Sequence, residues 1–380
     1  MYQNIVDFIR KIYHTEAFIP LHEPRFAGNE KAYVMNAIDS TFVSSVGEYV
    51  NRFEEMMCRI TGAKYSVATV NGTAALHIAL KLAGVGHGDE VIAPPLSFVA
   101  TANAISYCGA LPVFLDVDKA TLGLDPEALS DFLKCHATRG PGNSCLNRAT
   151  GKRIAACVPV HIFGHPCRID EILQVCGDYG IPVVEDAAES LGSSYKGRDT
   201  GTFGLMGIYS FNGNKTVTCG GGGAIVTDDE ALAKRAKHVT TTAKIPHPYE
   251  YVHDETGYNY RMPNLNAALA CAQLEQLEQF IDNKRDLAAQ YASFFKGIGI
   301  DFMHEPRNAR SNYWLNAIIL EDLAARDRFL EFTNQAKVMT RPCWRLMHRL
   351  PMFRACQTDG LKQAQWLEER VVNIPSSVRL

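Results

Sequence analysis

Residues 181–195 have the sequence IPVVEDAAESLGSSY, and this stretch is the clearest indication of how the chain folds. Four apolar residues lead directly into Glu185 and Asp186, without the alternation of polar and apolar residues that a half-exposed strand shows. Strands that are covered on both faces have such continuous apolar runs. The stretch therefore predicts an inner strand of a mostly parallel sheet, which carries two carboxylates to its carboxyl end.

The surrounding sequence repeats this pattern from about residue 61 to residue 228. Short runs rich in Val and Ile alternate there with longer helical patterns, which is typical of crossover units that build a parallel sheet. We expect strands at Tyr65–Val70, Glu90–Pro94, Leu111–Asp116, Ala155–His161, Pro182–Glu185, Gly207–Ser210 and Ala224–Thr227. We expect helices at Thr73–Leu82, Ser97–Tyr107, Asp125–Leu133 and Ile169–Tyr179. This order predicts a three-layer αβα domain, interrupted at residues 134–152 by an exposed excursion without apolar periodicity.

The pattern changes after residue 260. Apolar residues recur at helical spacing from Leu265 to about Phe295, and a short strand is expected at Tyr313–Leu320. A chain of 380 residues has room for two or three domains. We expect a large α/β domain with an N-terminal arm at residues 1–255, and a smaller α+β domain at residues 256–380 that is joined to it through a long helix.

Charge and composition exclude several classes of protein. The 38 Lys and Arg residues against 41 Asp and Glu residues give a net charge of −3, without the clustered positive charge that nucleic-acid binding requires. No apolar stretch approaches the roughly 18 residues that span a bilayer. The 11 Cys residues include no CxxC pair of the kind that binds zinc. We expect a cytoplasmic protein that binds no metal, nucleic acid or membrane.

Four segments place polar or aromatic residues where expected strands end, which is where open α/β sheets bind ligands. Gly72 and Thr73 begin a helix whose free backbone amides can hold an anion. Phe98 offers an aromatic face, Asp186 a carboxylate, and Lys215 an amine in the loop GNKTVTCGGGG. Taken singly, each residue also has an ordinary interpretation, as a helix cap, a core aromatic residue or a surface lysine.

Taken together, these residues fit pyridoxal phosphate. That cofactor needs a Lys amine for a Schiff base, a carboxylate on its ring nitrogen, an anion site for its phosphate and an aromatic face for its ring. Asp186 and Lys215 are 215 − 186 = 29 residues apart, which matches a strand, a crossover and a second strand. The combination is much more specific than any of its members.

The chain resembles the DegT/DnrJ/EryC1/StrS family of sugar aminotransferases over nearly its whole length. The motifs that carry the resemblance are FIPLHEPRFAGNE, NGTAALHIAL, GDEVIAPPLSFVATANAI, VPVHIFGHP, VVEDAAESLGSSYKG, YSFNGNK, GYNYRMPNLNAALACAQL and NIPSS. The resemblance implies the fold-type I architecture of pyridoxal-phosphate enzymes, with a three-layer αβα domain and a smaller C-terminal α+β domain. SFNGNK followed by GGGG, and TTTAKIPHPYEYVHDETGYNYRMPNLNAA, look most similar to the LegC/PglE-type branch of the family.

The resemblance also implies a role for each matching residue. Lys215 would form the Schiff base and shuttle the proton, and Asp186 would pair with the ring nitrogen. Further cofactor contacts would come from Gly72, Thr73, Phe98, Glu189 and Ser210 and, from the neighbouring subunit of a homodimer with composite active sites, Asn259. Substrate contacts are expected at His161, Arg261, Trp344 and His348. Dehydratases of the family replace the lysine with histidine, so Lys215 favours transamination.

The branch implies an enzyme that moves an amino group from L-glutamate to the 4-keto carbon of a nucleotide-linked 4-keto-6-deoxy sugar. The expected sugar is of the UDP-4-keto-6-deoxy-N-acetylglucosamine type, used for cell-surface glycans that contain legionaminic acid or bacillosamine-like residues. The cofactor would alternate between pyridoxal 5'-phosphate and pyridoxamine 5'-phosphate, and 2-oxoglutarate would leave as the second product.

Three alternatives stay open. An aminotransferase for GDP-4-keto-6-deoxymannose, similar to perosamine synthase, has the same GNK loop. A catalytically silent regulatory protein that binds pyridoxal phosphate has the same fold. A metal hydrolase would use His161 and His165, although a separation of four residues suits a zinc pair only on a helix.

Overall fold

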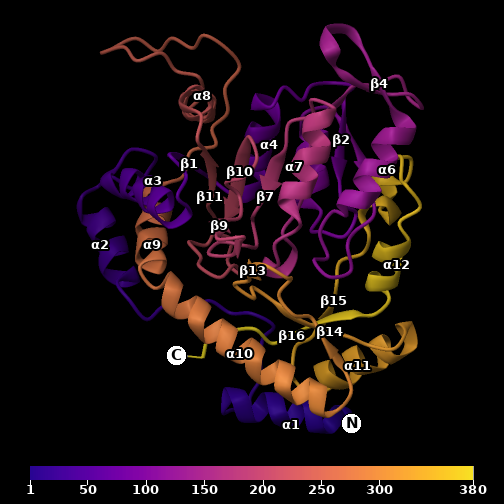
Figure 1. The fold of residues 1–380 in the computed structure, drawn as a ribbon. Helices are drawn as coiled ribbons and strands as arrows, with labels where there is room; N and C mark the ends of the chain where they lie inside the picture. The colour runs from indigo at the N-terminus through magenta and orange to yellow at the C-terminus, as the bar shows by residue number, and fades with distance from the viewer. Residues whose placement is uncertain (380) are drawn as a thin grey trace.

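The computed structural model describes residues 1–379, and a mixed sheet of seven strands forms the middle of its larger part (Figure 1). The strands lie in the order β1-β11-β10-β7-β6-β2-β3, where two isolated parallel bridges join β7 to β6. Their bounds are β1 Tyr65–Thr69, β2 Glu90–Ala93, β3 Leu111–Phe114, β6 Ile154–Cys157, β7 Val184–Asp186, β10 Met206–Ser210 and β11 Gly223–Thr227. Only β11 runs antiparallel to its neighbours, so the prediction of a mostly parallel sheet is confirmed.

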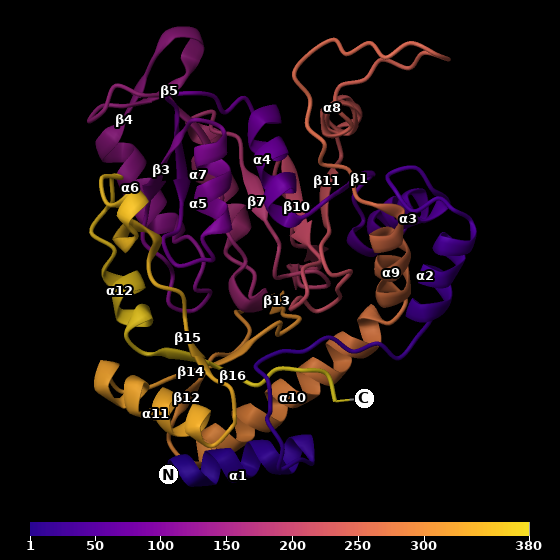
Figure 2. The ribbon, with the colours of Figure 1, turned by 180° about the vertical axis from the view of Figure 1, so that it is seen from behind.

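Helices cover both faces of this sheet, as the alternating pattern of the sequence requires (Figure 2). One face carries α4 Gly72–Leu82, α5 Ala100–Tyr107 and α8 Glu230–Thr240, and the other carries α3 Glu48–Thr61, α6 Pro126–His136, α7 Ile169–Asp178 and α9 Asn264–Leu274. Within β1, Val67 packs toward the first layer and Ala68 toward the second. The three-layer αβα architecture is therefore confirmed.

The C-terminal part is built around a second, smaller sheet. Its strands are β12 Asp301–Phe302, β14 Asn316–Ile319, β15 Arg341–Pro342 and β16 Val371–Ile374, in the antiparallel order β12-β14-β16-β15. The helices around it are α10 Leu277–Gly297, α11 Leu323–Gln335 and α12 Lys362–Glu368. Among residues 1–379, no helix combines the length and the apolar character that crossing a bilayer requires.

The N-terminal helix α1 (Tyr2–Tyr13) packs on this C-terminal part and not on the large sheet. Its apolar face joins residues of α10, α11 and the small sheet in one cluster, and the ring of Phe8 stacks on Phe294 with centroids 3.8 Å apart. The chain then passes through α2 (Glu30–Asp39), which lies beside α9. The domain boundary expected at residues 255/256 stays a prediction.

The excursion at residues 134–152 is more ordered than its composition predicts. Helix α6 continues to His136, and β4 Ala137–Arg139 then pairs with β5 Cys145–Asn147 in a hairpin. The buried amide of Asn147 explains this order, because its Nδ2 donates to Glu90 Oε2 at 2.7 Å and ties the hairpin to β2. A side chain that satisfies a buried carboxylate gives no signal in apolar periodicity.

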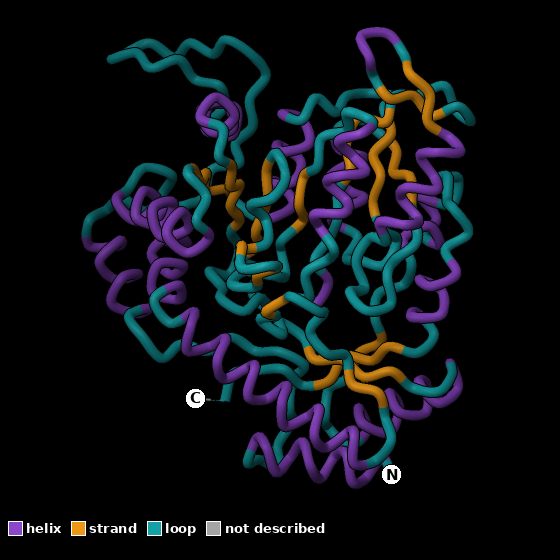
Figure 3. The backbone as a smooth tube through the Cα atoms, in the orientation of Figure 1, coloured by secondary structure: helices purple, strands orange, loops and turns teal. Residues whose placement is uncertain are grey.

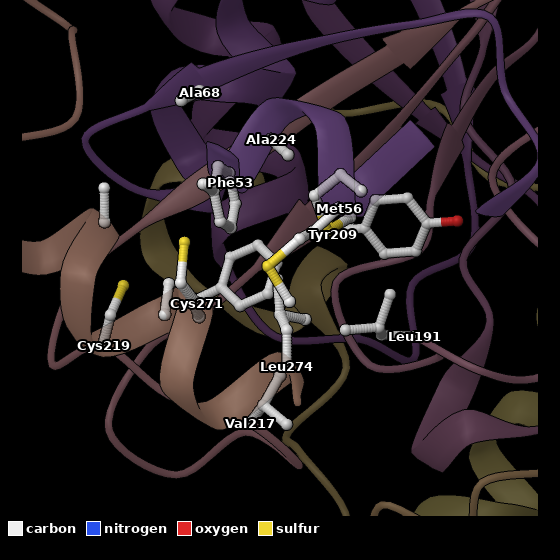
Figure 4. Packing of buried hydrophobic residues seen from close by; sticks show 14 of the residues in the cluster. Phe53, Met56, Ala68, Leu191, Tyr209, Val217, Cys219, Ala224, Cys271 and Leu274 are labelled. Carbon is white, nitrogen blue, oxygen red and sulfur yellow. The ribbon is translucent and has the colours of Figure 1, made fainter. Parts of the chain in front are cut away.

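Loops fill the region between the two sheets (Figure 3). A cluster of buried residues from α3, α9 and β10 packs next to the start of one of these loops. Phe53 of α3 is fully buried and meets Phe211, the residue after β10, edge to face at a centroid distance of 5.1 Å. Tyr209 and Leu274 belong to the same cluster (Figure 4). The core thus fixes the end of β10, from which the loop containing Lys215 starts.

Phe53→Ala should destabilise the protein by about 3–5 kcal/mol, because it removes a fully buried ring and leaves a cavity that the neighbouring strands cannot close. Urea denaturation followed by circular dichroism measures this loss. Glu55→Ala on the exposed side of the same helix is the matched control and should change the free energy of unfolding by less than about 0.5 kcal/mol. Equal effects of the two substitutions would contradict the packing described here.

Candidate active site

A cavity of about 350 Å³ lies at the carboxyl ends of β1, β7 and β10, where the large sheet faces the C-terminal part. Its walls come from segments that are far apart in the sequence. The lining residues are Asn71, Gly72, Thr73, Leu76, Ser97, Phe98, Ala100, Thr101, Val160, Asp186, Ala188, Glu189, Ile208, Ser210, Asn212, Asn214, Lys215, Trp314 and Trp344. The structure thus brings together Gly72, Thr73, Phe98, Asp186, Glu189, Ser210, Lys215 and Trp344 among the residues that the sequence singles out.

The first turn of α4 forms one end of this cavity. Asn71 Oδ1 caps the helix by accepting the backbone N–H of Ala74 at 2.8 Å. Gly72 is required here, because a Cβ at this position would lie 2.8 Å from Cβ of Ser210. The helix start and the Ser210 hydroxyl therefore approach each other closely enough to hold one anion between them.

Asp186 ends β7 and presents its carboxylate to the cavity. Thr101 Oγ1 donates to Asp186 Oδ2 at 2.9 Å, and the backbone N–H of Ala188 donates to Oδ1 at 3.2 Å. Burial raises the pKa of the Asp186 carboxyl, while the hydrogen bonds from Thr101 and Ala188 oppose this shift. The carboxylate can therefore bind a cation, or accept a hydrogen bond from an N–H group, that enters the cavity.

Lys215 and Glu189 form a loose ion pair in the same cavity. Lys215 Nζ lies 3.7 Å from Glu189 Oε1 and 3.9 Å from the ring centroid of Trp314. Burial lowers the pKa of the Lys215 amine, although the carboxylates of Glu189 and Asp186 oppose it. Burial also raises the pKa of Glu189 to about 7. An amine whose charged form is disfavoured is a better nucleophile near neutral pH than a surface lysine.

Two aromatic side chains stand at the mouth of the cavity. Phe98 is 55% exposed, although it lies in a segment that is otherwise mostly buried. Trp344 packs against Phe163 with ring centroids 5.0 Å apart. An apolar ring left exposed beside a cavity is suited to cover a flat ligand.

His161 does not line the cavity and instead contacts Glu185 and Cys167. Its Nε2 lies 3.1 Å from Glu185 Oε2, and its Nδ1 accepts the backbone N–H of Cys167 at 3.2 Å. Glu185 accepts three further bonds from the backbone N–H groups of Gly201, Phe203 and Gly204. His161 and His165 flank a single 3-10 turn, η2 (Ile162–Gly164), and both nitrogens of His161 are engaged. This geometry gives no support to the hypothesis of a zinc pair.

Asn259 and Arg261 are also not among the residues that line the cavity, although Arg261 pairs with Thr69 at the end of β1. Asn259 is exposed, and Arg261 lines a second cavity of about 420 Å³ together with Phe42, Val46 and Asn264. Phe42 and Val46 are large exposed apolar side chains. His348 lies in the 3-10 turn η3 (Met347–Arg349) and is half-buried.

Thr101 and Trp314 are site residues that the sequence reasoning missed. Thr101 follows Phe98 by three residues in the segment SFVATANAI, so its helical spacing could have indicated that it faces the same cavity. Trp314 has no such signal, because it reaches the site from the C-terminal part, about 100 residues after the lysine that it contacts.

The chain is similar to known proteins over most of its length. A model of the DegT/DnrJ/EryC1/StrS aminotransferase family matches residues 24–380. GDP-perosamine synthase of Escherichia coli O157:H7 is 35% identical over 359 residues, which cover 94% of this chain and 93% of that protein. A Bacillus subtilis protein, EpsN, named as a pyridoxal phosphate-dependent aminotransferase, is 38% identical over 336 residues, which cover 88% of this chain and 84% of that protein. The crystal structure of the aminotransferase TlmJ from Streptoalloteichus hindustanus superposes with a TM-score of 0.85 at 27% identity. The superposition covers 95% of this chain and 94% of TlmJ.

Glu189→Gln should change how the stability of the ligand-free protein depends on pH. The folded protein keeps the Glu189 proton up to a pKa of about 7, whereas the unfolded chain releases it near 4.5. The free energy of unfolding should therefore fall by up to about 1.4 kcal/mol per pH unit as pH rises through this window, and level off above it. The variant should lack this contribution.

Urea denaturation at half-unit steps from pH 4.5 to 8 gives the difference between wild type and variant. Glu55→Gln, which changes an exposed carboxylate, should follow the wild-type curve. Parallel curves for Glu189→Gln and wild type would contradict the raised pKa of Glu189.

Proposed function

The chain belongs to the DegT/DnrJ/EryC1/StrS aminotransferase family, and on this premise we propose that it aminates the 4-keto carbon of a nucleotide-linked 4-keto-6-deoxy sugar, with L-glutamate as the donor. Its cofactor is pyridoxal 5'-phosphate, which alternates with the pyridoxamine form during turnover. The observation that carries the proposal is the meeting, in one cavity, of the Lys215 amine, the buried Asp186 carboxylate and the first turn of α4.

The residues present fit this cofactor. A volume of about 350 Å³ lies within the range of roughly 300–1,000 Å³ that small-molecule sites occupy. The close approach of Gly72 to Ser210 suits the phosphate, and the exposed ring of Phe98 suits the flat pyridine. Asp186 Oδ1 accepts one long hydrogen bond of 3.2 Å, and Oδ2 accepts one hydrogen bond from the hydroxyl of Thr101. The carboxylate can therefore accept a further hydrogen bond from a ligand.

Bound in this cavity, the cofactor supplies an aldehyde that takes up an amino group and a ring that accepts electrons. Lys215 would hold the cofactor through its Nζ and, once free, would carry the proton that moves during transfer of the amino group. Asp186 would pair with the ring nitrogen, because its buried carboxylate can stabilise a positive charge there. Glu189 accepts the backbone N–H of Phe163 at 2.8 Å and so presents its other oxygen to the Lys215 amine.

Two nucleotides are candidates for the sugar substrate. The motifs around residues 210–270 favour a UDP-linked N-acetylated sugar of the kind used for legionaminic acid. The GDP-perosamine synthases, at 34–35% identity, favour GDP-4-keto-6-deoxymannose as the second candidate. Trp344 lines the cavity and His348 follows it by four residues in the chain, so we assign both to substrate binding.

We further propose that the protein is a homodimer with composite active sites. Arg261 lines a second cavity together with the exposed apolar residues Phe42 and Val46, and Asn259 lies two residues before it in the chain. Neither residue lines the cavity that contains Lys215 of the same chain. The segment between α8 and α9 projects from the molecule and exposes Tyr249 and Tyr251 at 80% and 82% (Figure 1). Exposed apolar patches of this kind mark protein interfaces, and a second copy would bring Asn259 to the phosphate of its partner.

A cytoplasmic location belongs to the same proposal. All 11 cysteines are free thiols, and eight of them are buried. Buried free thiols persist in a reducing compartment, because glutathione and thioredoxin keep them reduced there.

With L-glutamate as donor, the protein should aminate UDP-4-keto-6-deoxy-N-acetylglucosamine with a kcat/KM about tenfold or more above that for GDP-4-keto-6-deoxymannose. Mass spectrometry identifies the aminated sugar, and the release of 2-oxoglutarate confirms the donor. Lys215→Ala is the control and should form no product with either sugar. The opposite preference would select the GDP-linked candidate. Full activity of Lys215→Ala would overturn the assignment of the catalytic lysine, and failure to aminate either sugar would overturn the proposed reaction.

Two inactive variants should complement each other if the active sites are composite. Co-expression of Lys215→Ala and Asn259→Ala chains with different tags, in equal amounts, should restore about a quarter of wild-type activity, because half of the dimers then contain one intact site out of two. Each variant purified alone sets the background. Activity in the mixture that stays at this background would show that Asn259 serves the site of its own chain.

A further inference from the structure

Trp314 joins the C-terminal part of the molecule to the loop that carries Lys215. It lies between β13 (Ala309–Arg310) and β14 and is 3% exposed. Its indole Nε1–H donates to the backbone carbonyl of Asn214 at 2.7 Å, one residue before the lysine. Its ring centroid lies 3.9 Å from Lys215 Nζ. One side chain therefore holds both the backbone and the amine of the catalytic loop.

Trp314 is itself held in place from behind. Its backbone N–H donates to Asn312 Oδ1 at 2.8 Å, and its carbonyl accepts Lys284 Nζ at 3.2 Å. Asn312 in turn donates to the carbonyls of Glu189 and Leu191 at 3.0 and 2.9 Å. The backbones of Trp314 and Glu189 are thus tied to one another through Asn312. The indole ring and the carboxylate that these two residues carry both lie within 4 Å of the Lys215 amine.

The charged and titratable groups that face the Lys215 amine are few. Glu189 and Asp186 come from the end of β7, and His22 comes from the N-terminal arm. The two ring nitrogens of His22 are buried and make no hydrogen bond to the described residues. Burial and the positive charges of Lys284 and Lys215 lower the pKa of His22, so it stays neutral. The face of the Trp314 ring therefore provides much of the attraction that stabilises an ammonium group at Lys215.

We propose that the Trp314 ring and the Glu189 carboxylate form a resting site for the Lys215 amine, which the amine occupies whenever it is not joined to the cofactor. An aminotransferase must release its lysine in each half-reaction and later use the same amine again, so the free amine needs a fixed position near the reacting carbon. Trp314 is a positioning residue in this scheme. The inference rests on the proposed function of Lys215.

The chain offers a matched control in its own sequence. Lys119 Nζ lies 4.0 Å from the ring centroid of Trp366, almost the same distance as in the Lys215–Trp314 pair, but Lys119 is exposed and distant from the cavity. Cation–π attraction is weaker at an exposed site than at a desolvated one. The two pairs therefore report the same interaction in two environments.

The test measures how fast each lysine of the cofactor-free protein reacts with an amine-specific acylating reagent as a function of pH, by peptide mass spectrometry. In Trp314→Leu, the pH at half-maximal labelling of Lys215 should fall by about one unit, because the ammonium loses the aromatic face. In Trp314→Phe the fall should be about half as large. Lys119 and the remaining lysines should not change in either variant.

Replacing tryptophan by fluorinated tryptophans provides a second measurement that leaves the packing intact. Fluorine withdraws electrons from the ring face, so the labelling midpoint of Lys215 should fall further with each added fluorine, and that of Lys119 should fall by less than about 0.3 units. A purely structural role would change the maximal labelling rate and leave the midpoint unchanged. An unchanged or raised midpoint at Lys215 would overturn the proposal.

Because this labelling uses neither cofactor nor sugar, its result is separate from that of the activity tests. Active Lys215→Ala enzyme would refute the proposed catalytic role even if the labelling midpoints shift as expected. Unshifted midpoints together with inactive Lys215→Ala enzyme would refute only the resting site.

Discussion

Glu185 is the buried charge on which the geometry of the site depends. Its carboxylate accepts the backbone N–H groups of Gly201, Phe203 and Gly204, all at 2.6–2.8 Å, and lies 3.1 Å from Nε2 of His161. A buried carboxylate with four donors fixes every segment that supplies them, because losing any one donor leaves a charge unsatisfied. The end of β7 is fixed as a result, and the next residue, Asp186, is turned toward the cavity.

The large sheet and its helices could be predicted from the sequence because burial on both faces leaves continuous apolar runs, as in β7 and β11. The proximity of Asp186, Ser210 and Lys215 could be predicted as well, because each of them lies at or after the carboxyl end of a strand in this sheet. The β4–β5 hairpin could not, because a polar contact between Asn147 and Glu90 holds it. Trp314 could not either, because its position depends on how the two parts of the chain pack.

Two kinds of polar residue therefore look alike in the sequence but act differently. Glu185 and Asp186 are adjacent acids at the end of one strand, yet one has four donors and the other has two. The well-satisfied carboxylate supports the backbone, and the poorly satisfied one is left for a ligand. The same contrast separates His161, whose two nitrogens are engaged, from His165, whose nitrogens have no partner among the described residues.

The burial of Asp186, Glu189 and Lys215 also makes the stability of the folded chain depend on the concentration of its cofactor. Each of these groups is less stable in the cavity than in water, so the ligand-free protein folds with less free energy than its core alone would give. A molecule that binds only the folded state restores stability in proportion to the logarithm of its concentration. We therefore expect the free energy of unfolding of this protein to rise with the concentration of pyridoxal phosphate.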